Sequence, residues 1–157
     1  MLYSWLFVRS LSMAFIMKPS LILMTHGDFA DEILESAKFI VGEIEGAHTV
    51  SMAQEDGMDG TRAKLDHVLS AFPPDAELLI ITDIPGGTPC NIAIGKLFAS
   101  GNIRVLSGLN LGMLLEYALS SDEGLDELCA SVYDAGMSSI KIIRKPEGGA
   151  ATIELDE

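Results

Sequence analysis

The feature that most constrains this chain is an alternation of short apolar runs with longer amphipathic stretches. Leu21–Met24 and Glu77–Thr82 contain short aliphatic runs, which are typical of strands buried on both faces. Phe29–Val41 repeats its apolar residues at helical spacing. Strands that alternate with helices predict an α/β fold, with a doubly wound, mostly parallel sheet flanked by helices on both faces.

The rest of the chain continues this order. The expected helices are Thr61–Phe72, Pro89–Ser100, Leu111–Leu119 and one from Leu125 to Gly136, and the expected strands are His48–Met52, Ile103–Leu106 and Ser139–Ile143. Asp28, Thr88 and Asn110 stand where N-caps are expected, and Gly42 and Gly136 stand where helices are expected to stop.

Length and charge limit the class of protein. The 157 residues fit one domain. Ten Lys and Arg against 23 Asp and Glu give a net charge of −13, which argues against binding to nucleic acid or to an anionic membrane surface. Two cysteines are too few for a disulfide scaffold, so a reducing cytoplasm is expected.

The two ends of the chain are expected to lie outside the folded domain. Residues 1–16 are apolar with one charge, too short to span a membrane. They are interpreted as a leader without function or a misassigned start, with a secretory signal or membrane anchor as the alternatives. The domain is expected over residues 17–145. Residues 146–157 are expected to form a flexible acidic tail.

Chemically useful residues follow three of the predicted strands. Thr25–Asp28, Asp83–Pro89 and Ser107–Asn110 each come directly after a strand. Ligands of open α/β sheets bind beyond the carboxyl ends of the strands. The sequence therefore predicts that an imidazole, a carboxylate, a Gly-Gly turn and a hydroxyl meet at one edge of the sheet.

His26 and Asp83 are the candidate reacting pair in this group. A carboxylate that accepts one ring N–H leaves the other ring nitrogen as a nucleophile. Gly86, Gly87 and Thr88 precede a helix whose N-terminal N–H groups favour an anion. The alternatives are an ordinary turn histidine, a capping aspartate and an ordinary strand-to-helix turn.

The remaining candidates favour structural roles. His67 falls on a polar helix face, and His48 stands at the start of a predicted strand, so both are interpreted as surface or structural residues. Cys90 and Cys129 are expected to be small buried residues without metal-ligand spacing. The phosphate-binding motifs of nucleotide-driven kinases and of dinucleotide-binding enzymes are absent from the sequence.

Three motifs resemble those of the mannose-type IIA component of the bacterial phosphotransferase system. They are Thr25–Ala30 (Thr-His-Gly-Asp-Phe-Ala), Asp83–Ala93 (Asp-Ile-Pro-Gly-Gly-Thr-Pro-Cys-Asn-Ile-Ala) and Gly108–Leu114 (Gly-Leu-Asn-Leu-Gly-Met-Leu). The resemblance covers about residues 17–144. In this family the histidine usually lies about ten residues from the start, and His26 is tenth from Met17.

The resemblance implies a phosphocarrier for sugar uptake. His26 would accept phosphate from the phosphocarrier HPr and pass it to a separate IIB protein, which links it to the membrane components IIC and IID. Asp83 would orient the ring, while Gly86, Gly87 and Thr88 would hold the phosphoryl oxygens. Neither a metal nor a cofactor is implied. The family also implies a cytoplasmic homodimer, with Ser139–Ile143 exchanged or packed across the pair.

Two other functions fit the same histidine chemistry. One is a regulatory module whose phosphorylation state is read by another protein. The other is the phosphocarrier subunit that serves dihydroxyacetone kinase, although Phe29, Ala30 and Gly87–Pro89 fit its motifs less well. The sequence does not specify the sugar.

Overall fold

The computed structural model describes residues 18–121 and 124–144 of the chain. The elements in chain order are β1 (Ser20–His26), α1 (Phe29–Val41), β2 (Ala47–Met52), α2 (Gly57–Leu69), β3 (Leu78–Thr82), α3 (Thr88–Ala99), β4 (Ile103–Ser107), α4 (Leu111–Leu119) and α5 (Leu125–Ser138). Within these residues, no helix is long and apolar enough to cross a membrane.

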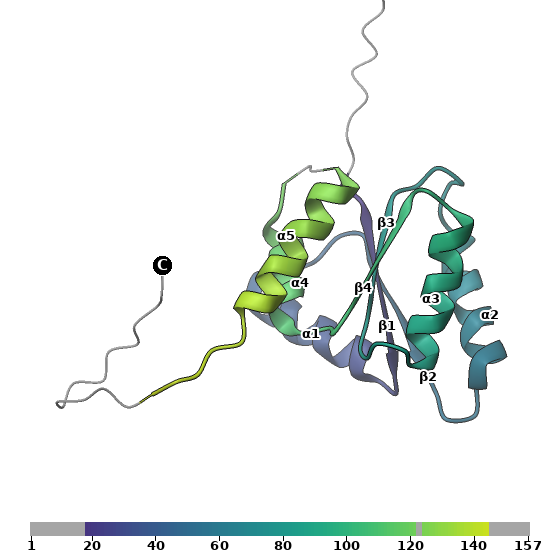
Figure 1. Ribbon diagram of the computed structural model, residues 1–157, viewed down its shortest axis with the longest axis horizontal. Helices are drawn as coiled ribbons and strands as arrows, with labels where there is room; N and C mark the ends of the chain where they lie inside the picture. The colour runs from purple at the N-terminus through teal and green to yellow at the C-terminus, as the bar shows by residue number, and fades with distance from the viewer. Residues whose placement is uncertain (1–17, 122–123, 145–157) are drawn as a thin grey trace, which may run out of the picture.

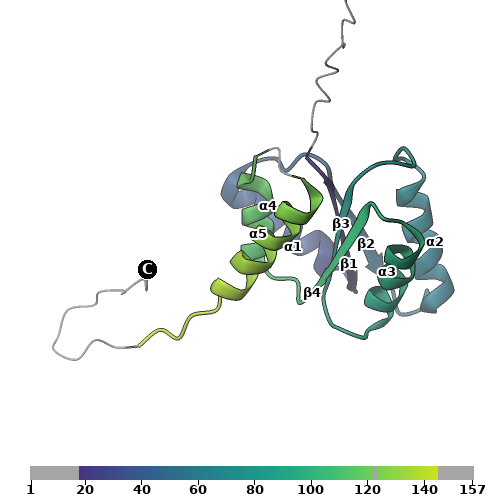
Figure 2. The same cartoon turned by 45° about the horizontal axis from the view of Figure 1, so that its top comes forward.

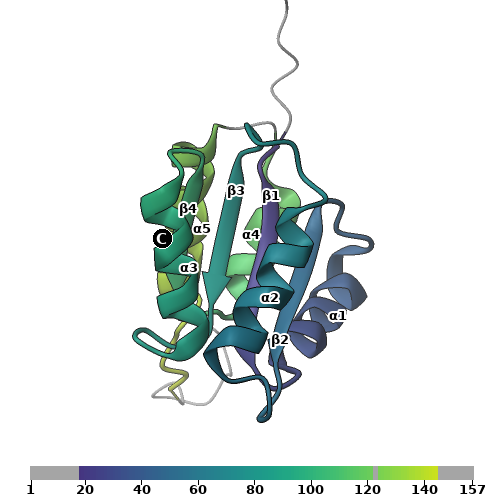
Figure 3. The ribbon, with the colours of Figure 1, turned by 90° about the vertical axis from the view of Figure 1, so that its right-hand side faces the viewer.

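The sheet has four parallel strands in the order β2-β1-β3-β4. Helices α1, α4 and α5 cover one face, and α2 and α3 cover the other (Figures 1 and 2). Figure 3 looks at the sheet past α2 and α3. The predicted α/β class, with helices on both faces of a parallel sheet, is confirmed.

The core forms two layers because successive side chains of a strand point to opposite faces. Leu21 and Leu23 of β1 pack under α1, α4 and α5. Ile22 and Met24 of the same strand pack in the second cluster, with residues of α2 and α3. This alternation places the side chain of His26, two residues after Met24, on the α2–α3 side of the sheet edge.

Capping differs from the sequence prediction at two helices. Asp28 makes no side-chain cap to α1, and the hydroxyl Oγ1 of Thr25 instead accepts the N–H of Ala30 at 2.8 Å. The N-cap of α3 is Gly87, with Thr88 as the first helical residue. Asn110 caps α4 as predicted, since its side chain accepts the N–H of Met113.

The C-terminal elements also need correction. Helix α5 passes through Gly136 and ends at Ser138, since that glycine is buried against α4 and has no left-handed conformation. Ser139–Ile143 is not a strand in the single chain, because α5 directs it away from the sheet and leaves it no strand to pair with (Figure 1). The predicted leader and tail lie outside the described residues.

Two leucines of α4 test the packing of the α1–α4–α5 layer. Leu114 is fully buried, whereas Leu119 is 74% exposed. Leu114→Ala should lower the free energy of unfolding by about 2–5 kcal/mol because it opens a cavity. Leu119→Ala should change it by at most about 0.5 kcal/mol. Equal losses in urea unfolding would contradict the assigned core.

Candidate functional site

The candidate site lies at the carboxyl edge of the two central strands. His26 is the last residue of β1, and Asp83 directly follows β3. The two strands pair in register, with Met24 opposite Thr82. Because paired parallel strands end at the same edge, residues 57 positions apart in the chain become neighbours.

The Asp83 carboxylate accepts three hydrogen bonds. Its Oδ2 lies 2.8 Å from both the backbone nitrogen and the ring Nδ1 of His26. Its Oδ1 accepts the backbone N–H of Ile84 at 2.8 Å. The carboxylate therefore fixes the backbone as well as the ring of His26.

The charge of Asp83 determines which ring nitrogen carries the proton. Burial raises the pKa of this carboxyl, but the hydrogen bonds from His26 and Ile84 outweigh that effect and hold the pKa below its ordinary value. An ionised carboxylate only accepts hydrogen bonds, so Nδ1 carries a proton. In a neutral ring Nε2 then has the free lone pair. The His26 side chain is 45% exposed, so large partners can reach it.

The Gly-Gly turn passes directly over the imidazole. A Cβ atom at Gly87 would lie 2.8 Å from Cε1 of His26 and 2.8 Å from Cγ2 of Ile84. Gly86 has a φ of 77°, a region that favours glycine. Only a residue without a side chain fits at position 87, because any Cβ there would overlap the side chains of His26 and Ile84.

Helix α3 begins at this turn. Its N-cap is Gly87, and the first intrahelical bond runs from the N–H of Asn91 to the carbonyl of Gly87, at 2.9 Å. The amide N–H groups that precede Asn91 in the first turn therefore have no intrahelical acceptor. Thr88 adds a hydroxyl there. This end of a helix is suited to hold an anion beside His26.

Two residues at this edge were not predicted from sequence. Asn91 donates from Nδ2 to the carbonyl of Gly86 at 2.9 Å and so holds the turn. Thr25 ties the first turn of α1 to the end of β1 through the bond to Ala30. The available signal was their place inside motifs, but the sequence does not show which backbone group a small polar side chain will bind.

All five predicted site residues meet at one place. His26, Asp83, Gly86, Gly87 and Thr88 lie on one turn and the strand end that it covers. The described residues contain no group of three or more His, Cys, Asp or Glu side chains that could hold a metal.

The other histidines and the cysteines are structural or superficial. His67 is exposed, and His48 packs edge-on against Phe72 with ring centroids 5.0 Å apart. Cys90 is buried in the first turn of α3, and Cys129 is half-buried. Burial raises the pKa of the Cys129 thiol. The placements of His67 and Cys90 agree with the sequence predictions, whereas Cys129 is less buried than predicted because it packs at the margin of the core.

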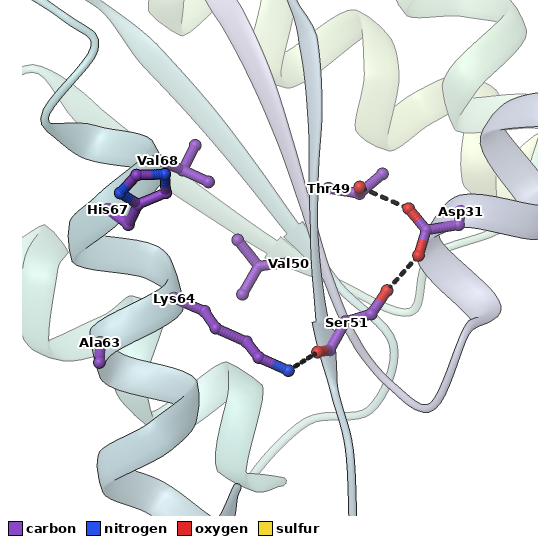
Figure 4. Close-up of a pocket in the computed structure, with 8 residues that line it drawn as sticks. All are labelled: Asp31, Thr49, Val50, Ser51, Ala63, Lys64, His67 and Val68. Carbon is purple, nitrogen blue, oxygen red and sulfur yellow. Dashed lines mark hydrogen bonds between the residues drawn. The ribbon is translucent and has the colours of Figure 1, made fainter.

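A separate hollow of about 580 Å³ flanks the edge strand β2 and is not lined by His26 or Asp83 (Figure 4). Asp31 accepts hydrogen bonds there from Thr49, at 2.5 Å, and from Ser51, at 2.6 Å. On the α2 side, Lys64 donates to the carbonyl of Ser51 at 3.0 Å. Hydrogen bonds from Ser51 and Thr49 lower the pKa of Asp31. These bonds tie α1 and α2 to β2.

The structure is a doubly wound α/β domain with a histidine–aspartate pair at the ends of its two central strands. The family model EIIA-man, described as the PTS system fructose IIA component, matches residues 20–133. The chain belongs to this family of phosphotransferase system IIA components.

Related proteins support this family assignment. The mannose-specific EIIAB component of Escherichia coli K12 is 26% identical over 138 residues, which are 86% of this chain and 43% of that protein. This chain therefore spans less than half of that relative. The fructose-specific EIIA component of Bacillus subtilis is 33% identical over 97 residues, 62% of this chain and 66% of that protein.

Solved structures show the same fold. The mannose/sorbose-specific IIA subunit from Enterococcus faecalis is 45% identical with a TM-score of 0.79, over 83% of this chain and 98% of that chain. An EIIA component from Streptococcus agalactiae is 32% identical with a TM-score of 0.71, over 78% and 95%.

Gly87→Ala tests the close approach of the turn to the ring. The new methyl group must displace His26 or Ile84, so the free energy of unfolding should fall by about 1–3 kcal/mol. The His26 ring signals should also shift in NMR spectra. Gly95→Ala in the same helix is the control, because its Cβ would meet no atom within 4 Å. A Gly87 variant that behaves like the Gly95 variant would refute the contact.

The lowered pKa of Asp83 predicts a pH dependence of stability. A carboxyl whose pKa is lower in the folded state stabilises the fold above its unfolded pKa, near 4, and loses this contribution as the pH falls through the folded pKa. Between about pH 5 and pH 2 the wild type should therefore lose more unfolding free energy than Asp83→Asn. Urea unfolding at each pH measures the difference. Parallel curves for the two proteins would exclude the effect.

Proposed function

We propose that this chain is a phosphocarrier of the phosphoenolpyruvate-dependent sugar phosphotransferase system. In this proposal His26 accepts a phosphoryl group from HPr and transfers it to a IIB protein for sugar uptake. The observation that carries the proposal is the His26–Asp83 pair, with the Cε1 edge of the ring close to Gly87 of the Gly-Gly turn. Membership of the EIIA-man family supports it.

The transfer needs one nucleophilic nitrogen and no change of oxidation state. Nε2 of His26 forms a bond to phosphorus while the bond from phosphorus to the donor breaks, and the leaving group keeps that electron pair. The ring becomes cationic as it gains the phosphoryl group. The ionised Asp83, 2.8 Å from Nδ1, stabilises that charge.

The turn and helix α3 would stabilise the phosphoryl oxygens. Negative charge is spread over these oxygens in the transition state, and fixed N–H dipoles offset it. The N–H groups at the start of α3 and the hydroxyl of Thr88 are the proposed donors, with Gly86 and Gly87 allowing the backbone to come close. These groups are part of the fold, so this step requires no metal.

Both partners must reach His26 in turn. The imidazole is 45% exposed, and the apolar side chains of Phe29, three residues after His26, and Ile84, next to Asp83, are 43% and 54% exposed. IIB would connect this chain to the membrane components IIC and IID. A cytoplasmic location follows from this role. The family match does not favour the regulatory module or the dihydroxyacetone kinase subunit.

The proposal includes a homodimer. Ile140, Ile142 and Ile143 are 74–79% exposed in the single chain, and β4 is an edge strand with an open side. Exchange or packing of residues 139–143 between two copies would bury the isoleucines and cover that edge.

A labelling experiment tests the phosphorylation site. The protein is incubated with phosphoenolpyruvate, enzyme I and HPr, and its intact mass is measured. One acid-labile phosphate should appear on the wild type and be absent from His26→Ala. His67→Ala is the matched control, because His67 is exposed on α2, and it should label like the wild type. Normal labelling of His26→Ala would refute the assignment.

The same assay tests Asp83. In Asp83→Asn the side-chain amide can donate to Nδ1 and stabilise the tautomer in which Nε2 carries the proton. Labelling should slow by about 10²-fold or more, since a comparable change in serine proteases costs about 10⁴-fold. A wild-type labelling rate would remove Asp83 from the mechanism.

A further inference from the structure

The loop after β4 holds the C-terminal end of α5 through one side chain. Asn110 uses both of its amide N–H groups and its carbonyl oxygen in this loop. Its Nδ2 donates to the carbonyls of Gly108 and Gly136, each at 3.3 Å. Its Oδ1 accepts the N–H of Met113 at 3.3 Å and lies 3.2 Å from the hydroxyl of Ser139.

Asn110 therefore caps two helices. It is the N-cap of α4, where its Oδ1 satisfies an N–H group that has no intrahelical acceptor. The Gly136 carbonyl belongs to the last turn of α5, where carbonyls lack intrahelical donors. The Ser139 hydroxyl has a single proton, and its shorter contact is also to the Gly136 carbonyl, at 2.8 Å.

Two glycines allow α4 and α5 to approach closely at this joint. A Cβ at Gly112 would lie 2.6 Å from Cβ of Ser139, and one at Gly136 would lie 2.6 Å from Cγ of Met113. Neither glycine has a positive φ, so the requirement is for space. The side chain of Ser139 is thus held against the first turn of α4.

Residues 139–144, here called the C-terminal arm, start at this joint. The arm leads away from the sheet (Figure 1). Ile140, Ile142 and Ile143 of the arm are exposed, as are Tyr133 and Met137 on the preceding turns of α5. Among the described residues, a single chain thus leaves the apolar side chains of the arm exposed and the outer edge of β4 without a neighbouring strand. Two copies could cover both reciprocally.

We propose that Asn110 is a positioning residue for self-association. By joining the α4 N-terminus to the end of α5, it fixes the place and direction from which the arm extends towards a second copy. This inference rests on the proposed homodimer. The joint fixes the arm before the copies meet, so less conformational freedom is lost on association.

Asn110→Asp keeps the cap of α4 and removes the cap of α5. The carboxylate still accepts the Met113 N–H and remains a good N-cap, but it donates nothing to Gly136 and repels that carbonyl. The dimer dissociation constant, measured by sedimentation equilibrium, should rise about fivefold or more, as expected for one lost hydrogen bond. Gln54→Glu adds the same charge in the exposed turn between β2 and α2, at the opposite edge of the sheet from β4, and should leave the constant unchanged.

Gly112→Ala tests the same joint by packing, without added charge. Its methyl group must push Ser139 away from α4, so this variant should also weaken the dimer. Gly95→Ala in α3 is its control, because that position is open. Far-UV circular dichroism of each protein, diluted to monomer, should match that of the wild type. If Asn110→Asp does not fold, the comparison of Gly112→Ala with Gly95→Ala tests the proposal instead.

The outcomes separate the two proposals. A wild-type dimer that is weakened by Asn110→Asp and Gly112→Ala, and not by the controls, supports the positioning role. A wild-type dimer with the same dissociation constant in every variant overturns that role and leaves the homodimer intact. A wild type that is monomeric at all concentrations refutes the homodimer, and the inference with it.

Discussion

The candidate site depends on the parallel pairing of β1 with β3. Because Met24 lies opposite Thr82, the two strands end together, and Asp83 receives both the backbone N–H and the ring nitrogen of His26. One carboxylate thus holds the position of the strand end and the orientation of the imidazole. A shift of one residue in this register would separate the pair. The reactivity proposed for Nε2 follows from this single contact.

The turn before α3 adds the second half of the site. Its approach to the imidazole requires that Gly87 have no side chain, and Asn91 holds the turn in place through the Gly86 carbonyl. The start of α3 then presents N–H groups beside the ring. The proposed nucleophile and the helix end proposed to bind an anion are thus assembled from backbone and short side chains. In the proposed transfer, the net charge of −13 would favour encounter with a positively charged partner surface.

The loop after β4 lies at the same carboxyl edge of the sheet and is hydrogen-bonded to the end of β3. The N–H groups of Gly108 and Leu109 both donate to the carbonyl of Thr82, at 2.9 and 3.0 Å, directly before Asp83. Asn110 follows in the same loop and holds the end of α5. The region proposed for transfer and the joint proposed for self-association therefore share one rigid support. The two regions use different side chains: His26 and Asp83 for the proposed transfer, and Asn110 for the proposed self-association.

The sequence by itself determined the α/β class and the residues of the candidate site. Aliphatic strands alternate with amphipathic helices, and local spacing reports this directly. The motifs around His26 and Asp83 predicted that these residues lie at the carboxyl edge of the sheet, and the structure places them there. Tertiary structure alone decided which oxygen meets Nδ1, how close Gly87 lies to the ring, and that Asn110 caps two helices. It also left residues 139–143 without the predicted strand, because a strand needs a neighbour and α5 directs them away from the sheet. Such contacts join residues far apart in the chain, so local pattern carries no record of them.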